Sequence, residues 1–415
     1  MTKIRFLVVS DIHTCDEDPT TFKTPSYVST QGAGPSGSVE PISALIKEVK
    51  REFGTVDFVV CAGDLTQQAL PAGINYIASQ LRLVATNLKA QNLIVINGNH
   101  DVDSRYKFNN FDPRGQLRQS LPDMPFISIP DEDISGSRVN HLEYFAEHLS
   151  MRTFGSVRIV AIDSAAFHGA GKPETPEYLH GRISPIMLRA LEEKLQADNG
   201  QYDVNILLCH HHPLNNNLPG EIDSSEMDGG SALLEILDSG GFGDWFVIHG
   251  HKHRPRLRYA PGEVAPPVIL SAASLSAQLA DAQNRSPNQF HVVTFDLDLA
   301  KSLSFSMAGS VQSWSWVPGS GWYPASTDGL PSRAGFGFRG EPRSLATKLA
   351  ATLKSVSPPR AFWEWAEVTA LHPEVNALMP KSLEQVLSIL ENEHGLQPGR
   401  NSRQEVCQLG VPSNG

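Results

Sequence analysis

Five short stretches of this chain combine carboxylate, imidazole and amide side chains in patterns that suit metal chemistry. The most specific is Asn97-Gly98-Asn99-His100-Asp101, which follows a short apolar run. Polar residues of this kind are costly to bury alone, so we expect the five stretches to be partners of one another. The other four are Asp11-Ile12-His13, Gly63-Asp64, His210-His211-His212-Pro213 and Gly250-His251-Lys252-His253.

Together the stretches offer oxygen and nitrogen ligands and no thiolate. Such a set suits manganese, iron, zinc, cobalt or nickel ions rather than an iron–sulfur cluster or a structural zinc site. The candidate ligands outnumber what one ion needs, which favours two ions that share a carboxylate. Each stretch alone could be a polar turn closed by side-chain hydrogen bonds. Their joint occurrence, each after a predicted strand, favours the metal interpretation.

The elements that would position these side chains are short apolar runs typical of buried strands. Such runs end just before the five stretches, at 4–9, 56–60, 93–96, 204–208 and 245–248. Helical spacing at 42–50 and 72–88 separates the first three runs, and this β-α-β-α-β order predicts a parallel sheet covered by helices. Ligands bind at the carboxyl edge of such sheets, so the five stretches should converge there.

The remaining chain suggests three regions. We expect a catalytic domain over residues 1–310, a loop-rich connector over 311–341, and a small helical appendage over 342–415 with a disordered tail after about Gln397. Residues 14–40 and 102–137 are expected to be irregular loops beside the site. The tryptophans of the connector are interpreted as packing anchors, with nucleobase stacking as the alternative, at positions Trp314, Trp316 and Trp322.

Composition narrows the function classes. The net charge is -11 and no long Lys/Arg run is present, which argues against a dedicated nucleic-acid-binding protein. The four cysteines are scattered, which argues against a disulfide framework or a structural zinc module. No apolar stretch approaches the roughly 20 residues that span a bilayer. The first residues lack the pattern of a signal peptide, so we expect a cytoplasmic protein without membrane contact.

The ordered motifs resemble the calcineurin-like metallophosphoesterase superfamily over about residues 3–310. The resemblance implies an α/β fold of four layers, in which two mixed β-sheets pack face to face with flanking helices. It implies that the first metal ion is bound by residues matching Asp11, His13, Asp64 and His253. The second ion would be bound by those matching Asp64, Asn99, His211 and His251. Asp64 would bridge the ions, and His211 is selected by its place two residues before Pro213, with His210 and His212 as alternatives.

The resemblance also implies a mechanism. Two ions such as Mn²⁺, Fe²⁺/Fe³⁺ or Zn²⁺, about 3.5–4 Å apart, would share a water, lower its pKa and bind the phosphoryl oxygens. The bridging hydroxide would then attack phosphorus. His100 would stabilise the transition state or protonate the leaving group, and Asp101 would orient it. The His-His-His-Pro stretch is similar to the cyclic-nucleotide and glycerophosphodiester phosphodiesterase branch, so the expected substrate is a small phosphodiester such as a nucleotide, or a phosphomonoester.

Two other functions stay open, namely a metal-dependent DNA or RNA nuclease and a scaffold that uses the same fold to bind a protein. Acidity argues against the first, and the complete ligand set argues against the second. The helical appendage could bind a protein partner or a second copy of the chain. His180 and Arg182 are a possible phosphate contact, and His249 is interpreted as a core or supporting residue. Asp163 and Ser164 receive no catalytic role.

Overall fold

The computed structural model describes residues 2–18, 24–32, 39–129, 134–198, 200–215, 225–278, 286–326, 329–357 and 360–411. The chain divides into two units. The larger unit comprises Arg5–Val292 and Trp314–Tyr323, and the smaller unit comprises Met1–Ile4, Val293–Ser313 and Pro324–Gly415. All five candidate stretches belong to the larger unit. Within the described residues, no helix has the length and apolar content needed to cross a membrane.

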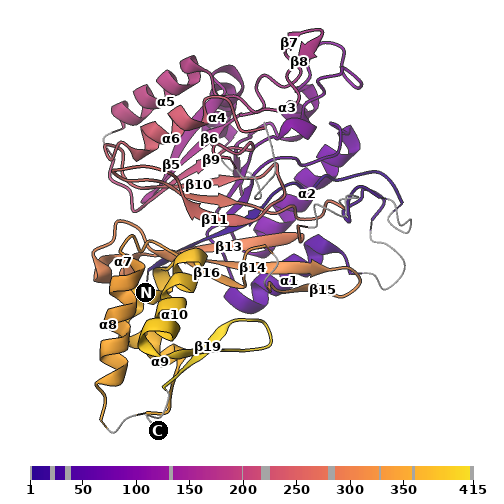
Figure 1. The fold of residues 1–415 in the computed structure, drawn as a ribbon. Helices are drawn as coiled ribbons and strands as arrows, with labels where there is room; N and C mark the ends of the chain where they lie inside the picture. Colours follow the sequence, from indigo (N-terminus) through magenta and orange to yellow (C-terminus); the bar gives the residue numbers. More distant parts are fainter. Residues whose placement is uncertain are drawn as a thin grey trace. The chain divides into compact units, whose positions relative to one another are not determined.

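The first sheet of the larger unit contains the predicted parallel strands β1 (Lys3–Val9), β2 (Phe58–Cys61) and β3 (Asn92–Val95). Helices α1 (Pro41–Phe53) and α2 (Pro71–Asn87) connect them (Figure 1). Strand β4 (Phe126–Ser128) pairs antiparallel with β3. On the other side of β1, the sheet continues through β13 (Gln289–Asp296), β14 (Gly309–Val317) and β15 (Gly321–Pro324), of which residues 289–292, 314–317 and 321–323 belong to this unit.

The second sheet of the larger unit has the strand order β11-β12-β10-β9-β6-β5. Its inner strands run parallel, whereas the edge strands β5 and β11 are antiparallel to their neighbours. Phe154 on β5 packs edge-on against Phe58 on β2, with ring centroids 5.7 Å apart, so the two sheets face each other. The strands are β5 (Leu149–Phe154), β6 (Val157–Ile162), β9 (Val204–Leu208), β10 (Trp245–His249), β11 (Arg256–Tyr259) and β12 (Val268–Ser271).

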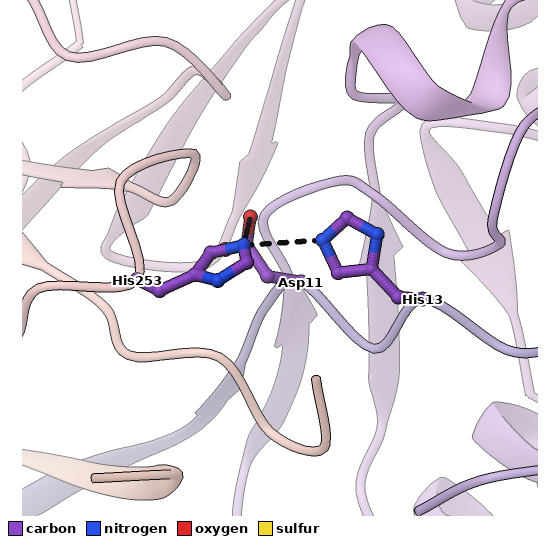
Figure 2. A group of neighbouring side chains, drawn as sticks. All are labelled: Asp11, His13 and His253. Atoms are coloured by element: carbon purple, nitrogen blue, oxygen red, sulfur yellow. Dashed lines mark hydrogen bonds and ion pairs between the residues drawn. The ribbon is translucent and has the colours of Figure 1, made fainter. Parts of the chain in front are cut away.

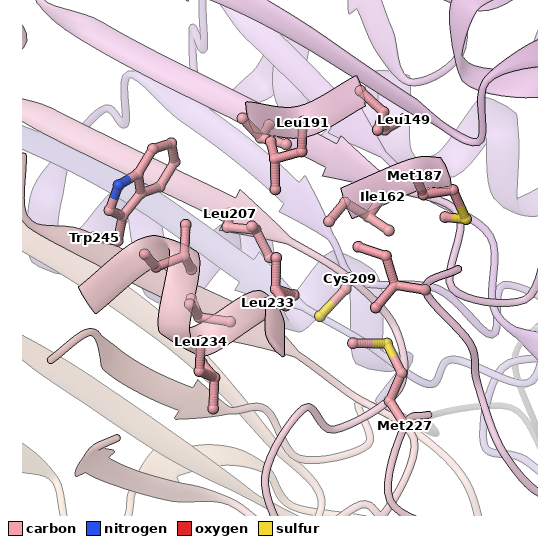
Figure 3. Close-up of a cluster of buried hydrophobic side chains, with 14 of the residues drawn as sticks. Leu149, Ile162, Met187, Leu191, Leu207, Cys209, Met227, Leu233, Leu234 and Trp245 are labelled. Carbon is pink, nitrogen blue, oxygen red and sulfur yellow. The ribbon is translucent and has the colours of Figure 1, made fainter. Parts of the chain in front are cut away.

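The outer face of the second sheet is covered by α5 (Pro185–Ala197) and α6 (Gly230–Asp238). Figure 3 shows Leu191 of α5 and Leu233 of α6 beside Leu207 of β9, all fully buried. Burying a side chain of this size contributes about 1.5–3 kcal/mol. The prediction of an α/β fold, with two mixed sheets face to face and flanking helices, is confirmed. The remaining elements are α3 (Gly115–Ser120), α4 (Ile134–Ala146), β7 (Gly171–Lys172) and β8 (Thr175–Pro176).

The segment expected to be a loop-rich connector is richer in strands than the sequence suggested. Residues 311–341 include most of β14, all of β15, and β16 (Arg333–Phe336). Trp314 stacks on Phe290 with ring centroids 5.0 Å apart, and Trp322 donates its indole N–H to the carbonyl of Pro41 at 2.8 Å. The three connector tryptophans are buried. They are therefore packing residues, and their rings are not available to stack a nucleobase.

The smaller unit contains the predicted helices α8 (Pro342–Lys354) and α10 (Pro380–His394), but its last residues differ from the prediction. Instead of a disordered tail after about Gln397, β18 (Gln397–Arg400) and β19 (Val406–Gly410) form a sheet with β17 (Phe362–Glu364). Leu409 of β19 is fully buried in the apolar cluster made with α8 and α10, which explains why this polar segment is ordered. The unit also contains α7 (Leu297–Leu303) and α9 (Trp365–Leu371).

Candidate metal centre

The five polar stretches meet at the carboxyl edges of the two sheets. Asp11 and His13 follow β1, Asp64 follows β2, and Asn99 follows β3. From the second sheet, the histidine triplet follows β9, and His251 and His253 follow β10. Buried strands from both sheets thus deliver the side chains to one place, as expected for ligand sites in α/β proteins.

The first group of side chains comprises Asp11, His13 and His253, drawn in Figure 2. Nε2 of His253 lies 3.2 Å from Oδ1 of Asp11 and 3.1 Å from Nε2 of His13. Two imidazole nitrogens and a buried carboxylate oxygen therefore converge within a space that one cation can fill. Two imidazole nitrogens this close need a proton or a cation between them, which is the observation that fits this group to a metal ion.

Asp64 connects the first group to a second one. Its Oδ2 atom lies 3.6 Å from Nε2 of His13 and 3.2 Å from Nε2 of His210, and it forms a further ligand group with His210 and His251. Nδ1 of His251 lies 3.1 Å from Oδ1 of Asn99. Asp64 is therefore the residue that faces both groups, as a bridging carboxylate must. We call these seven residues the metal centre: Asp11, His13, Asp64, Asn99, His210, His251 and His253.

Hydrogen bonds behind the imidazoles fix their orientation. Nδ1 of His13 lies 3.0 Å from Oε1 of Gln67, and Nδ1 of His210 lies 2.7 Å from the carbonyl oxygen of Ala62. In each ring the nitrogen away from the centre donates its proton, so Nε2 points at Asp64. Metal-binding histidines are held in this way by partners of their outer nitrogen.

Backbone conformation also marks these residues. Several ligand residues adopt left-handed conformations, which cost about 1–3 kcal/mol each for residues other than glycine. Hydrogen bonds between the loops hold them there, including the Asp11 amide to the Gly63 carbonyl at 2.9 Å and the His251 amide to Oδ1 of Asp11 at 3.0 Å. The φ angles are 51° at Asp11, 50° at His13, 52° at Asp64, 73° at His251 and 54° at His253.

The charges of the centre are balanced in a way that favours cations. Burial alone would raise the pKa of Asp11 and of Asp64, but neighbouring histidines outweigh it, and both carboxyls have a lowered pKa. Burial lowers the pKa of His13 to about 3. Burial also opposes a charge on His210, yet Asp64 outweighs burial and raises the pKa of His210 to about 9. A proton on His210 thus supplies positive charge that a bound metal ion would replace.

Of the three consecutive histidines, the structure brings His210 to Asp64, whereas the sequence prediction had named His211. Side chains alternate along β9 and the residues that follow it. Leu207 and Cys209 point into the outer core under α5 and α6, so His210 points inward. His211 also lies beside the centre, because its ring centroid is 4.5 Å from that of His251, and its Nδ1 is 2.9 Å from Oγ of Ser164. Because β9 is buried on both faces, its sequence carried no alternation that could have selected His210.

His100, which also forms a possible ligand group with His13 and Asp64, lies next to the metal centre, as does Asp101. The backbone amide of His100 donates to Oδ1 of Asp64 at 2.8 Å, and its partly exposed ring packs edge-on against His13 at 4.7 Å. The carboxylate of Asp101 accepts hydrogen bonds from the amides of Gly98 at 2.8 Å and Thr66 at 3.0 Å. Burial and the nearby Asp64 raise the pKa of Asp101 to about 7. Asp101 therefore fixes the turn that carries Asn99 and His100.

Several supporting residues carried little or no signal in the sequence. Asp163 accepts a hydrogen bond from Nδ2 of Asn97 at 2.9 Å and thereby connects the ends of β6 and β3. Ser164 accepts from the amides of His210 and His211 at 3.2 and 3.1 Å. A serine or aspartate after a strand is too common to reveal such a role.

Other histidines of the chain lie outside the ligand groups. His249 is fully buried, as predicted for a core residue, and its Nδ1 is 3.0 Å from the Gly250 carbonyl. His180 pairs with Glu177 at 3.2 Å, and Arg182 pairs with Asp228 at 2.5 Å. These acidic partners already neutralise the side chains that were considered for phosphate binding.

The family of the chain is revealed by comparison with known proteins. Residues 4–255 match the family model described as calcineurin-like phosphoesterase. No curated protein matches the chain. Among solved structures, it is similar to the purple acid phosphatase PPD1 of yellow lupin (Lupinus luteus), with 13% identity and a TM-score of 0.45 over 76% of this chain and 52% of that one. The chain thus spans about half the length of that phosphatase.

Two further solved structures are similar to the chain. One is a single mutant of Vps29 from Entamoeba histolytica, with 11% identity and a TM-score of 0.32 over 80% of this chain and 99% of that one. The other is GAP50, described as the anchor in the inner membrane complex of Plasmodium, with 12% identity and a TM-score of 0.39 over 75% of this chain and 84% of that one.

Proposed function

The chain belongs to the calcineurin-like phosphoesterase family, and we propose that it is a dinuclear metal-dependent phosphodiesterase acting on a small molecule such as a nucleotide. The observation that carries the proposal is the position of Asp64, which faces two groups of ligands at once. The first ion is assigned to Asp11, His13, Asp64 and His253. The second ion is assigned to Asp64, Asn99, His210 and His251.

The donor set decides which ions are suitable. Carboxylate, amide and imidazole ligands without thiolate fit Mn²⁺, Fe²⁺/Fe³⁺ or Zn²⁺. When bound, such ions act as Lewis acids toward phosphoryl oxygens and lower the pKa of water. Two divalent ions would carry more charge than the two carboxylates of the centre, Asp11 and Asp64, so the loaded site would stay positive and attract an anionic phosphate ester.

His100 is assigned the role of proton donor to the leaving oxygen. Its amide is held by Asp64 and its ring lies at the edge of the centre, partly exposed, where a substrate can reach it. A neutral or protonated imidazole at this position can donate a hydrogen bond to the departing oxygen. Asp101 supports this residue indirectly, because its carboxylate fixes the backbone on either side of the Asn99–His100 turn.

The preference for a diester rests on the space beside His100. A cavity of about 330 Å³ is lined by Asn99 and His100, which gives room for a second esterified group. The motif resemblance to cyclic-nucleotide and glycerophosphodiester phosphodiesterases points the same way. A phosphomonoesterase needs no such room on this side of the phosphorus.

The test is a panel of substrates assayed with metal-loaded protein. Bis-p-nitrophenyl phosphate, p-nitrophenyl phosphate and cyclic nucleotides are each assayed with Mn²⁺, Fe²⁺ and Zn²⁺, and Asp64→Asn serves as the inactive control. We expect diester turnover that depends on metal and is lost in the control. Absence of metal-dependent turnover of every substrate, by folded protein with bound metal, would overturn the proposal.

A further inference from the structure

The cavity beside His100, here called the side cavity, is lined by several residues that the proposed reaction does not use. Asn99 and His100 border it toward the metal centre. The side chains of Arg105 and Lys107 are exposed, and both come from the loop that follows this turn. Besides Asn99 and His100, the lining residues with polar or charged side chains, these two cations included, are Gln68, Asp103, Ser104, Arg105, Lys107, His168 and Tyr178.

The loop that carries the two cations is fixed by a buried carboxylate. Asp103 accepts hydrogen bonds from the backbone amides of Lys107 at 2.8 Å, Phe108 at 2.7 Å and Asn109 at 2.9 Å. These bonds satisfy the carboxylate within the loop and hold Arg105 and Lys107 at the rim of the side cavity. The carboxylate of Asp103 thus accepts hydrogen bonds from backbone amides, and it keeps its negative charge.

A second loop, between β6 and β7, also borders the side cavity. Gly169 has a φ of +80°, and a Cβ atom placed on it would lie 2.5 Å from Cβ of Ser104. Only glycine permits this approach, which brings His168 to the cavity. Nδ1 of His168 is buried and has no hydrogen-bond partner in the described part of the chain. A buried nitrogen of this kind is satisfied when a ligand or a water supplies the partner.

Aromatic contacts hold the guanidinium of Arg105 without neutralising it. Its Cζ atom lies 5.4 Å from the ring centroid of Tyr178, and the same ring packs edge-on against His168 at 5.4 Å. Nζ of Lys107 lies 4.9 Å from the ring of Phe108. Neither cation forms an ion pair with any residue that the structure describes. The positive charges at the side cavity are therefore free to meet an anion.

We infer that the side cavity binds a second anionic group of the substrate, a carboxylate or a phosphate, while the scissile phosphodiester lies at the metal centre. The inference rests on the proposed phosphodiesterase function. Two cations that form no ion pair among the described residues favour an anion over a neutral group. The guanidinium of Arg105 lies over one face of the Tyr178 ring, so this face is not open to a stacked base. The selected substrates are thus small diesters with at least one negative charge beyond the scissile phosphate.

The experiment compares three diesters that release the same p-nitrophenolate. Phenyl p-nitrophenyl phosphate, whose phenyl group is uncharged, is the reference, and its 4-carboxyphenyl and 4-phosphonophenyl analogues add a second anion on the group that remains on phosphorus. The readout is the ratio of kcat/KM for each anionic ester to kcat/KM for the phenyl ester. This ratio cancels losses that affect all three substrates equally. Mn²⁺-loaded wild-type protein is compared with Arg105→Ala, Lys107→Ala, the double variant and Arg105→Glu.

The matched control is Arg189→Ala, which removes an exposed arginine from α5, outside the lining of the side cavity. We expect at least one anionic ester to be preferred about tenfold by the wild type and by this control. The preference should decrease in each single variant, vanish in the double variant and reverse in Arg105→Glu. The larger of the two wild-type ratios identifies the anion.

Three results would overturn the inference. The first is a wild-type ratio of one or less for both anionic esters, and the second is an unchanged ratio in the double variant. In both cases turnover of the phenyl ester still supports the phosphodiesterase function. The third is no p-nitrophenolate release from any ester by folded, metal-loaded protein, which overturns the phosphodiesterase function itself. Circular dichroism of each variant establishes that it is folded.

Discussion

Nε2 of His210 lies 3.2 Å from Oδ2 of Asp64, while Nδ1 of the next residue, His211, lies 2.9 Å from Oγ of Ser164. This relationship supports the proposal that His210 completes the second ligand group. It follows from the inward direction of His210, because Leu207 and Cys209 occupy the outer core.

The first prediction concerns metal content. His210→Ala should lose one of the two proposed ions, because it removes a ligand and its pairing with Asp64. His211→Ala should keep both ions and lose only about 10–100-fold in activity, as expected when a supporting partner is removed. Elemental analysis of the purified variants, together with kcat/KM for bis-p-nitrophenyl phosphate, measures both effects. If instead His211→Ala loses an ion and His210→Ala keeps both, then His211 is the ligand.

The second prediction separates the two chemical roles of His100. His100→Ala should keep its metal ions and lose about 10²–10⁴-fold in kcat. If His100 donates a proton, the loss is larger for alkyl diesters than for p-nitrophenyl diesters, because p-nitrophenolate leaves without protonation. Equal losses for both kinds of ester would exclude proton donation and leave charge stabilisation. His180→Ala is the control, because His180 pairs with Glu177 outside the metal centre.

The third prediction uses the pH dependence of folding stability. Burial would raise the pKa of Asp163, but Arg114, His148 and Asn97 outweigh burial and lower it. A carboxyl whose pKa is lower in the folded than in the unfolded chain adds stability above the unfolded value of about 3.9, and this stability disappears as the pH falls through the folded value.

Asp163→Asn should therefore reduce the free energy of unfolding by about 1–3 kcal/mol at pH 7, and the difference should narrow below about pH 4. Denaturant titrations of the wild type and of Asp163→Asn at pH 7, 5 and 3.5 measure this difference in the free energy of unfolding. A difference that does not change with pH would mean that shape, rather than charge, explains the effect.

The fourth prediction concerns removal of the ions by a chelator. Activity should be lost, whereas the far-UV circular dichroism should be retained, because Gln67 and the Ala62 carbonyl hold the ligand rings without metal. The melting temperature should fall, since an ion that binds only the folded chain stabilises it. Addition of Mn²⁺ should restore activity. Loss of secondary structure on chelation would show that the ions are needed for folding.

The fifth prediction tests the close contact behind His210. Gly63 has a φ of +95°, and a Cβ atom on it would lie 2.6 Å from Nδ1 of His210. Gly63→Ala should lower the free energy of unfolding by at least about 1 kcal/mol and weaken metal binding. Gly54→Ala is the control, because Gly54 also has a positive φ, of 73°, but meets no atom within 4 Å. If Gly63→Ala and Gly54→Ala change the metal content equally, the contact between Gly63 and His210 has no role in metal binding.

Much of the metal centre could be predicted because strand ends are visible in a sequence. Apolar runs predicted β1, β2, β3, β9 and β10, and the polar residues that follow these strands were expected to meet at the sheet edges. The choice within the histidine triplet was not visible in the same way. Strand β9 is buried on both faces, so its sequence shows no alternation from which the inward side could be assigned.

Other features depend on contacts that no local pattern encodes. His168 reaches the side cavity only because Gly169 packs against Ser104, which lies far away in the sequence. The residues after Gln397 have a polar, turn-like composition, yet Leu409 anchors β19 in the apolar cluster of the smaller unit. In both cases tertiary packing decides the structure of a segment whose own sequence carries little preference.

The left-handed backbone at five of the proposed ligand residues makes their arrangement depend on the folded chain. At Asp11, His13 and His251 the backbone amide is held by a hydrogen bond to a neighbouring loop, so a short peptide carrying the same motif would relax and lose the ligand geometry. The proposed binding site is therefore complete only in the folded chain. The protein should therefore be refolded in metal-free buffer first and loaded with metal ions afterwards.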